Sequence, residues 1–407
     1  MKRTHFYVLC LAFFISCDNK IELKQTDLLG VWKLELDVES EEKSIPFFLE
    51  FISENSVLKA AFWNGEEKIV HEYVMLKNDS VILDNPYFNS TIRLKFNRNT
   101  VEGVWTDHNR KDYQMRVSGK YNLTHRFKFN QPLNDSIDGK WEVWFGNDDK
   151  YKAIGLFNTD QNSMKGTFLT ETGDYRFLEG GFGGNSLLLS TFDGAHAFLF
   201  DATLKGDTIN GWFYSGKHFK EPFVAWRNDT VTLSNPYKLT ELVDPEKPVS
   251  FSFMDTEGKR ISLEDSSFLD KPLIIQIMAS WCPNCKDQLE YFSGIQDKLA
   301  EQNVEMVALS FERLSYENVL PSLKKVKKAH NIKYPILYAG SADKSVAVKS
   351  VPWIKEVVSY PTLLYVLPNR KVFRIHTGFY GPGTGANYKL QVRRIEDDIR
   401  NLVMLSK

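Results

Sequence analysis

The sequence predicts an all-β antiparallel region of two repeats, each a barrel or a sandwich, followed by an α/β domain. Residues 27–228 hold short alternating runs broken by Asn, Asp and Gly, a pattern typical of antiparallel strands. Two stretches of this region, LLGVWKLEL and IDGKWEVWF, resemble each other, which indicates an internal repeat. Beyond residue 250, strand-like and helix-like runs alternate, which indicates an α/β domain.

The N-terminus, residues 1–17, has the features of a secretory signal peptide. Two basic residues precede an apolar run that is too short to span a bilayer. The run ends at Cys17 in a motif that resembles the lipobox of bacterial lipoproteins, although Phe14 stands where that motif usually has Leu. The resemblance implies lipidation of Cys17, a polar tether over residues 18–26, and a periplasm-facing lipoprotein of the bacterial cell envelope. Cleavage elsewhere, with Cys17 an ordinary signal-peptide residue, is the alternative.

The two repeats are assigned to residues 27–130 and 131–235, as two units of similar size. Each contains a Gly close to a Trp at a matching place. Such a Gly lets the chain bend or approach a neighbour, and the Trp would then fill a barrel or sandwich core. A ligand cavity is the other interpretation, because small antiparallel barrels can enclose one.

A linker is predicted over residues 236–250, where prolines and charges interrupt the strand pattern. The domain that follows, residues 251–407, begins with an apolar strand and a helix whose apolar residues recur at helical spacing. A second helix contains Pro321, which we expect either to kink it or to lie in its first turn. With the remaining strand-like and helix-like runs, the domain has a β-α-β start and a β-β-α end.

Cysteine use points to redox chemistry in the C-terminal domain. Cys10 leaves with the signal peptide and Cys17 takes lipid, so only Cys282 and Cys285 remain. One pair provides no disulfide framework, and zinc usually needs four Cys or His ligands. We therefore expect no metal and no cofactor beyond a redox-active disulfide. The formal net charge of −1 gives no indication of nucleic-acid binding.

Four motifs carry a resemblance to a known family. SWCPNC stands between an apolar strand and a helix, and SYPTLLYV follows later in the domain. NVEMVALSFE with IKYPILYAG resembles an αβ insertion, and RIHTGFYGPGTG resembles a last strand with its turn. With these motifs, residues ~245–407 resemble the TlpA/ResA-like branch of the thioredoxin superfamily, the membrane-tethered thiol-disulfide oxidoreductases of bacteria.

The resemblance implies a thioredoxin-like fold and roles for the residues of the CPNC motif. Cys282 would lie at a helix N-terminus, where unpaired N–H groups and the helix dipole favour the attacking thiolate. Cys285, one turn further on, would resolve the mixed disulfide. Pro283 suits the first helical turn, where its missing N–H costs nothing. Asn284 brings no positive charge to the thiolate, and Trp281 would pack at the rim of the site or in the core.

Other site residues follow from the same resemblance. Pro361 would be a cis-proline, and Tyr360 before it would offer its backbone to an extended substrate segment. Thioredoxins bury a proton-accepting acid where this chain has Gln276, although many relatives of this branch lack it, and some relatives place a Glu where this chain has Gln288. A glutamine cannot accept that proton. Glu290 is two positions away from the second of these positions and is expected to point elsewhere.

The leading hypothesis is an exported, lipid-anchored disulfide reductase. It would take electrons from a membrane dithiol donor and pass them to oxidised protein substrates. A thiol peroxidase is an alternative, although Ala279 stands where peroxiredoxins place the threonine of their peroxide site. A third hypothesis is a binding protein that acts through its β repeats and carries an accessory redox domain.

Overall fold

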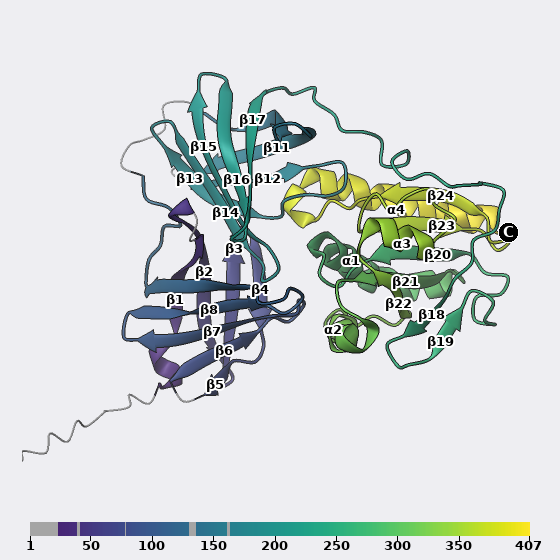
Figure 1. Cartoon of the computed structure of the whole chain (residues 1–407), viewed down its shortest axis with the longest axis horizontal. Coiled ribbons are helices and arrows are strands. Elements are labelled where there is room, and N and C mark those ends of the chain that lie inside the picture. The colour runs from purple at the N-terminus through teal and green to yellow at the C-terminus, as the bar shows by residue number, and fades with distance from the viewer. Residues whose placement is uncertain (1–22, 39–40, 78, 130–135, 161–162) are drawn as a thin grey trace, which may run out of the picture.

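The computed structural model describes residues 23–38, 41–77, 79–129, 136–160 and 163–407. The predicted signal peptide, Cys17 and residues 18–22 of the tether lie outside the described residues. Figure 1 shows two β units stacked on one side and an α/β unit beside them. Within the described part of the chain, no helix is both long and apolar enough to cross a membrane.

The first β unit is a nine-stranded antiparallel sheet with the order β4-β3-β2-β1-β9-β8-β7-β6-β5. Alternate residues of β1 are buried, so one face of this strand forms core. Its elements are η1 (Gln25–Asp27), β1 (Gly30–Val38), β2 (Lys43–Glu54), β3 (Val57–Asn64), β4 (Glu67–His71), β5 (Met75–Lys77), β6 (Ser80–Asp84), β7 (Ser90–Asn97), β8 (Thr100–Asp107) and β9 (Gln114–Tyr121).

The second β unit is a closed antiparallel barrel of strands β10 to β17. Phenylalanine rings fill its core, and the Phe168 and Phe200 ring centroids stack at 4.5 Å. This packing favours the core interpretation of the Gly and Trp pattern over a ligand cavity. The strands are β10 (Gly139–Phe145), β11 (Tyr151–Asp160), β12 (Ser163–Leu169), β13 (Leu178–Gly183), β14 (Ser186–Phe192), β15 (Ala197–Lys205), β16 (Thr208–Ser215) and β17 (Phe219–Arg227).

The two β units repeat the same local geometry. Gly30 and Gly139 open their first strands with φ of 111° and 112°, a region that side chains with a Cβ rarely adopt. Trp32 and Trp141 follow two residues later, and each indole N–H donates to the carbonyl four residues before it at 2.9 Å. The resemblance between the two sequence stretches therefore corresponds to one structural element used twice.

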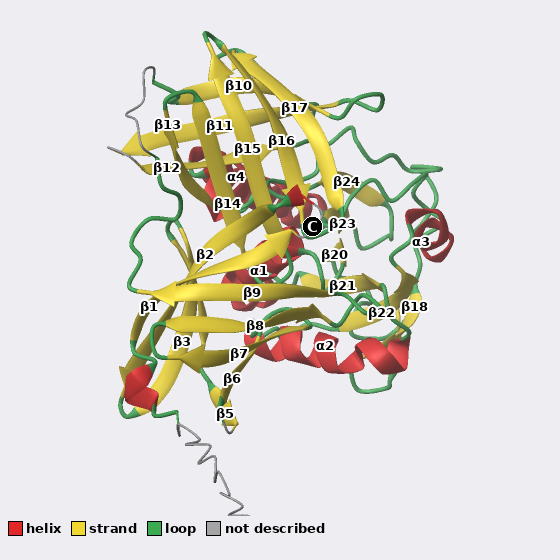
Figure 2. Cartoon of the chain, turned by 60° about the vertical axis from the view of Figure 1, so that its left-hand side comes forward, coloured by secondary structure: helices red, strands yellow, loops and turns green. Residues whose placement is uncertain are grey.

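The two β units share a core. Phe192 of the barrel packs against Phe47 and Trp105 of the sheet, with ring centroids at 4.4 and 5.3 Å. Arg126, in the connection between the units, is buried and donates to Glu179 at 2.9 Å. Figure 2 shows β2 reaching from the sheet toward β14 of the barrel. Sequence patterns predict strands but not which faces of them meet.

The C-terminal unit has a thioredoxin-like fold, which confirms the predicted fold class. Its sheet has the order β19-β18-β22-β21-β20-β23-β24, with β20, β21 and β22 parallel. The elements are β18 (Ser252–Asp255), β19 (Arg260–Ser262), β20 (Leu273–Met278), α1 (Pro283–Glu301), β21 (Glu305–Glu312), α2 (Tyr316–Ala329), β22 (Ile336–Ser341), α3 (Lys344–Ser350), β23 (Thr362–Val366), β24 (Val372–Thr377), η3 (Pro382–Thr384) and α4 (Ala386–Leu405).

The structure adds two details that local sequence patterns did not predict. Pro321 lies inside α2, beyond its first turn, so that one backbone hydrogen bond of the helix is missing there. Residues 236–250, which were predicted to be a linker, make contacts with the C-terminal unit. Leu242 forms a bridge with Ile354, and the Tyr237 hydroxyl donates to Asp398 at 2.9 Å.

Candidate active site: a dithiol at the start of helix α1

The two cysteines lie where a buried strand passes into a helix. All residues of β20 are buried, and the turn after it leads to Cys282, the N-cap of α1. The backbone N–H of Cys285 donates to the sulfur of Cys282 at 3.3 Å. Pro283 occupies the first helical position, where no N–H is needed. A backbone donor therefore points at the sulfur that would carry negative charge.

The loop before β23 faces this pair. The Tyr360–Pro361 peptide bond is cis, as the motif predicts. The Cys282 thiol donates to the carbonyl oxygen of Tyr360 at 3.3 Å. The loop is held by Thr362, whose hydroxyl donates to the Ser359 carbonyl at 2.9 Å. The backbone of Tyr360 is thus adjacent to the first sulfur of the pair.

The two sulfurs differ in burial. Both cysteines are free thiols, and Cys282 is 7% exposed whereas Cys285 is fully buried. Burial raises the pKa of the Cys285 thiol well above its usual value, and its neighbour Cys282 raises it further. The more accessible sulfur suits the attacking role, and the enclosed one suits the resolving role.

Gln276 and Gln288 lie together beneath the dithiol. Both are fully buried, and the Gln276 amide donates to Gln288 Oε1 at 2.8 Å. Gln288 is one helical turn after Cys285, on the same face of α1. Glu290 turns away, as expected, and pairs with Lys286 at 3.0 Å on the outer side. These two positions thus contain an amide pair that cannot accept a proton.

A buried carboxylate at the end of β21 was missed by sequence reasoning. Glu312 accepts the backbone N–H and the hydroxyl of Ser280, each at 2.8 Å, and so supports the turn before Cys282. Burial raises the pKa of Glu312. Its only sequence signal is that an acidic residue ends a strand whose interior is mostly apolar.

Trp281 lies at the rim of the site, with its ring between two partners. The Arg313 guanidinium is 4.1 Å from the ring centroid, and the Tyr360 ring meets it edge-on at 5.8 Å. The same indole lines a small pocket with Asp107 and Arg110 of the nine-stranded sheet. Trp281 therefore contacts the first β unit and also packs against the core of its own unit.

The barrel contributes directly to the site through residues 170–177 between β12 and β13, here called the barrel loop. The Asn284 side chain donates to Asp174 Oδ2 at 3.0 Å, and the Gly381 N–H donates to the same oxygen at 2.6 Å. The Ser359 hydroxyl donates to the Thr172 carbonyl at 3.3 Å. Burial raises the pKa of Asp174 to about 6, although the nearby Arg176 partly offsets this rise. The loop thus contacts both the CPNC motif and the cis-proline loop.

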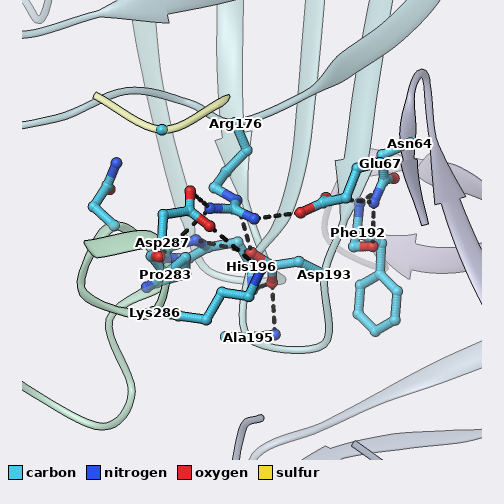
Figure 3. A network of polar contacts seen from close by, with 12 residues as sticks. Asn64, Glu67, Arg176, Phe192, Asp193, Ala195, His196, Pro283, Lys286 and Asp287 are labelled. Atoms are coloured by element: carbon cyan, nitrogen blue, oxygen red, sulfur yellow. Dashed lines mark hydrogen bonds and ion pairs between the residues drawn. The ribbon is translucent and has the colours of Figure 1, made fainter. Parts of the chain in front are cut away.

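A buried ion network joins the three units next to the dithiol (Figure 3). Arg176 of the barrel loop pairs with Asp287 on α1 and with Glu67 on β4. Asp193, from the barrel, approaches the same guanidinium at 3.7 Å. Sequence reasoning missed these residues, since nothing local marks a charge that becomes buried between units.

A groove of about 700 Å³ lies between the barrel and the C-terminal unit. The C-terminal unit contributes Asn284, Ser359 and Tyr360 to its lining. The barrel contributes residues 150–152 and 170–175 together with Trp144. Among the described residues, no cluster of three or more His, Cys, Asp or Glu is placed to hold a metal.

Comparison with known proteins gives one family match. Residues 245–374 match the AhpC/TSA family. A thiol:disulfide interchange protein of the thioredoxin family from Chlorobium tepidum is 21% identical, with 36% of this chain and 97% of that one covered and a TM-score of 0.28. A thiol-disulfide oxidoreductase from Bacteroides fragilis is 16% identical, with coverages of 36% and 99% and a TM-score of 0.27. Peroxidoxin BcpB from Mycobacterium tuberculosis is 17% identical, with coverages of 38% and 96% and a TM-score of 0.27.

Proposed function

We propose that this chain is a thiol-disulfide oxidoreductase that reduces disulfides through Cys282 and Cys285. One observation carries the proposal. The Cys282 sulfur accepts an N–H at the start of a helix and lies beside the backbone of a cis-proline loop. This geometry favours a thiolate that faces an edge where an extended substrate segment can lie.

The exchange proceeds in two successive steps. The Cys282 thiolate attacks one substrate sulfur, so that an S–S bond forms to the enzyme while the substrate S–S bond breaks and one thiolate leaves. Cys285 then loses its proton and attacks Cys282. The enzyme becomes the disulfide and the second substrate thiol is released. The substrate disulfide gains two electrons and the enzyme dithiol loses them.

The compartment and the direction of electron flow are part of the proposal. The signal-like N-terminus and the lipobox-like motif at Cys17 support export and a lipid anchor in the cell envelope. A membrane dithiol donor would regenerate the pair, and oxidised proteins would receive the electrons. A reduction potential of the pair near that of thioredoxin, about −270 mV, is the expected value for a reductase.

Turnover with a simple disulfide tests the activity. The full chain should reduce 2-hydroxyethyl disulfide in the presence of dithiothreitol faster than the reductant does alone. The Cys282→Ser variant should fall to the uncatalysed rate. Retention of catalysis by that variant would remove Cys282 from the mechanism and with it the proposal.

A thiol peroxidase is the second candidate, and the AhpC/TSA match favours it because peroxiredoxins share this broad family. The geometry offers a peroxide little support. Ala279 has no hydroxyl, and the Ser280 hydroxyl is already donated to Glu312 at 2.8 Å. Consumption of hydrogen peroxide by the purified protein distinguishes the two functions. We expect slow consumption, and rapid Cys282-dependent consumption would favour the peroxidase.

A further inference from the structure

We propose that the tip of the barrel loop, residues 170–174, is an autoinhibitory contact that a peptide substrate must displace. The inference rests on the proposed function, because it concerns access to the same dithiol. The main chain of this segment, here called the loop tip, occupies the edge of the cis-proline loop along which an extended substrate would lie. The structure therefore represents a closed form, in which a substrate competes with the loop tip before its S–S bond reaches Cys282.

The loop tip contacts three neighbouring segments of the C-terminal unit. The first is the CPNC motif, where the Asn284 amide donates to Asp174 Oδ2 at 3.0 Å. The second is the cis-proline loop, where the Ser359 hydroxyl donates to the Thr172 carbonyl at 3.3 Å. The third is the turn after β24, where the Gly381 N–H donates to Asp174 Oδ2 at 2.6 Å. Because one segment contains the cysteines and another accepts the first thiol, the loop tip lies beside the dithiol.

Main chain meets main chain at this contact. A Cβ added to Gly378 would lie 2.8 Å from the Thr172 carbonyl oxygen, closer than real side chains approach, so the two backbones touch directly. The Tyr380 hydroxyl also donates to the Thr170 carbonyl at 3.0 Å. An extended peptide that binds through its main chain offers the same carbonyl groups. The loop tip thus makes the kind of contact that a substrate segment would make, and with the tip in this place Cys282 is 7% exposed.

The composition of the loop tip allows it to lift. Its sequence, TETGD, contains no apolar side chain, so displacement removes none of its side chains from a hydrophobic core. Leu169 before the tip and Tyr175 after it pack against hydrophobic clusters of buried residues. The tip also contains its own turn, in which the Thr170 N–H donates to the Gly173 carbonyl at 2.7 Å. Leu169 and Tyr175 therefore bound a short polar segment that can leave its contacts as a unit.

The anchor of the barrel loop is a separate and stronger contact. Arg176 follows the loop tip closely, is 2% exposed, and pairs with Asp287 and Glu67. Removing a partner from a buried ion pair costs far more free energy than losing one hydrogen bond between partly exposed groups. Opening therefore breaks the contacts of the loop tip, while Arg176 continues to hold the barrel and the first β unit on the helix that carries the cysteines.

Trapping a substrate on Cys282 tests whether the loop tip leaves. The full-length Cys285→Ser variant is converted to a mixed disulfide with a disulfide-linked peptide and, as the matched control, to the methyl disulfide with methyl methanethiosulfonate. Displacement by a peptide main chain should make the amides of residues 168–177 exchange hydrogen several-fold faster than in the methyl adduct. Equal or slower exchange in the peptide adduct would show that the loop tip stays in place, which would overturn the inference.

Loosening the contact tests whether it inhibits. Tyr380→Phe removes the hydroxyl that donates to the Thr170 carbonyl and changes nothing else in the shape of the ring. Because only the open fraction of the protein accepts a peptide, kcat/KM rises in proportion to that fraction. Loss of one hydrogen bond should therefore raise kcat/KM for a disulfide-linked peptide about fivefold. Asp174→Ala removes the acceptor of two donors and should raise it further.

Matched controls separate this inference from the proposed function. Tyr316→Phe removes a hydroxyl that donates to the Asp255 carbonyl at 2.8 Å within the C-terminal unit, and it should keep the wild-type kcat/KM. Wild type, Tyr380→Phe and Tyr316→Phe should turn over 2-hydroxyethyl disulfide alike, because this substrate has no peptide main chain to compete with the loop tip.

Two kinds of failure remain distinguishable. An unchanged or lower kcat/KM for the peptide in both loosened variants would overturn the inference, as would an equal rise for 2-hydroxyethyl disulfide in Tyr380→Phe, since the dithiol itself would then have changed. Absence of 2-hydroxyethyl disulfide turnover in the wild type, together with no adduct on Cys282, would instead overturn the proposed function.

Discussion

Arg176, on a loop of the β-barrel, pairs with Asp287, which lies two residues after Cys285 on the active-site helix. The same guanidinium reaches Glu67 in the first β unit (Figure 3). All three side chains are at most 9% exposed. The barrel and the first β unit are therefore joined by ion pairs to the helix that carries the two cysteines.

The first prediction concerns this network. Arg176→Met keeps side-chain volume but leaves the carboxylates of Asp287 and Glu67 buried without their cation. Removal of one partner of a buried ion pair costs about 3–5 kcal/mol of unfolding free energy. Urea unfolding, followed by tryptophan fluorescence, measures that loss.

An exposed ion pair between the barrel and the nine-stranded sheet provides the control for the Arg176 variant. Lys165 of the barrel pairs with Glu66 of the sheet at 3.3 Å, with side chains 51% and 76% exposed. Lys165→Met should cost no more than about 1 kcal/mol, because water screens such pairs. If the two variants lose equal stability, the network at Arg176 is not what holds the units together.

The second prediction concerns the cover over the dithiol. Asp174→Ala removes the acceptor shared by Asn284 and Gly381, so the barrel loop should open more often. Alkylation of Cys282 by a bulky polyethylene-glycol maleimide should accelerate several-fold relative to alkylation by iodoacetamide. Asp207→Ala, at an exposed turn between β15 and β16, should leave the ratio of the two rates unchanged. An unchanged ratio in the Asp174 variant as well would show that the loop does not limit access.

The third prediction follows from the raised pKa of Asp174, which burial lifts to about 6. The folded protein binds this proton more tightly than the unfolded chain does. Protonated Asp174 therefore contributes to the free energy of unfolding at low pH, and this contribution is lost as pH rises through 6. Relative to Asp174→Asn, the wild type should lose about 1–2 kcal/mol of unfolding free energy between about pH 4.5 and about pH 7. All other titrating groups are common to both proteins, so their contributions to the pH dependence of stability cancel. A gain over this interval would contradict the assigned direction of the shift.

The fourth prediction restores a proton acceptor beside the resolving cysteine. Gln288→Glu places a carboxylate one turn after Cys285, where the Gln276 amide can donate to it. Because burial raises the pKa of the Cys285 thiol, we expect its deprotonation to limit the second step at neutral pH. The second step should therefore become about tenfold faster or more. Stopped-flow release of the second thiol measures it, and Glu290→Gln is the control that should change nothing. A slower or unaltered second step in Gln288→Glu would assign proton removal to another group.

Local patterns predicted much of the fold and of the chemistry. The strand, CPNC and helix order places Cys282 at the N-cap, and the Gly and Trp repetition corresponds to equal geometry at Trp32 and Trp141. These features depend on neighbours in the chain. The barrel loop, by contrast, meets the CPNC motif from 110 residues away. No periodicity signals that Asp174 will accept from Asn284, because that contact arises only when separate units pack.

Capture of the reaction intermediate tests the central claim most directly. The full-length Cys285→Ser variant, incubated with a disulfide-linked peptide, cannot complete the second step. Mass mapping should then find the peptide attached to Cys282, with free thiol restored by dithiothreitol, while the wild type should instead yield a Cys282–Cys285 disulfide. Absence of any adduct on Cys282, together with a wild type that stays reduced, would contradict the account.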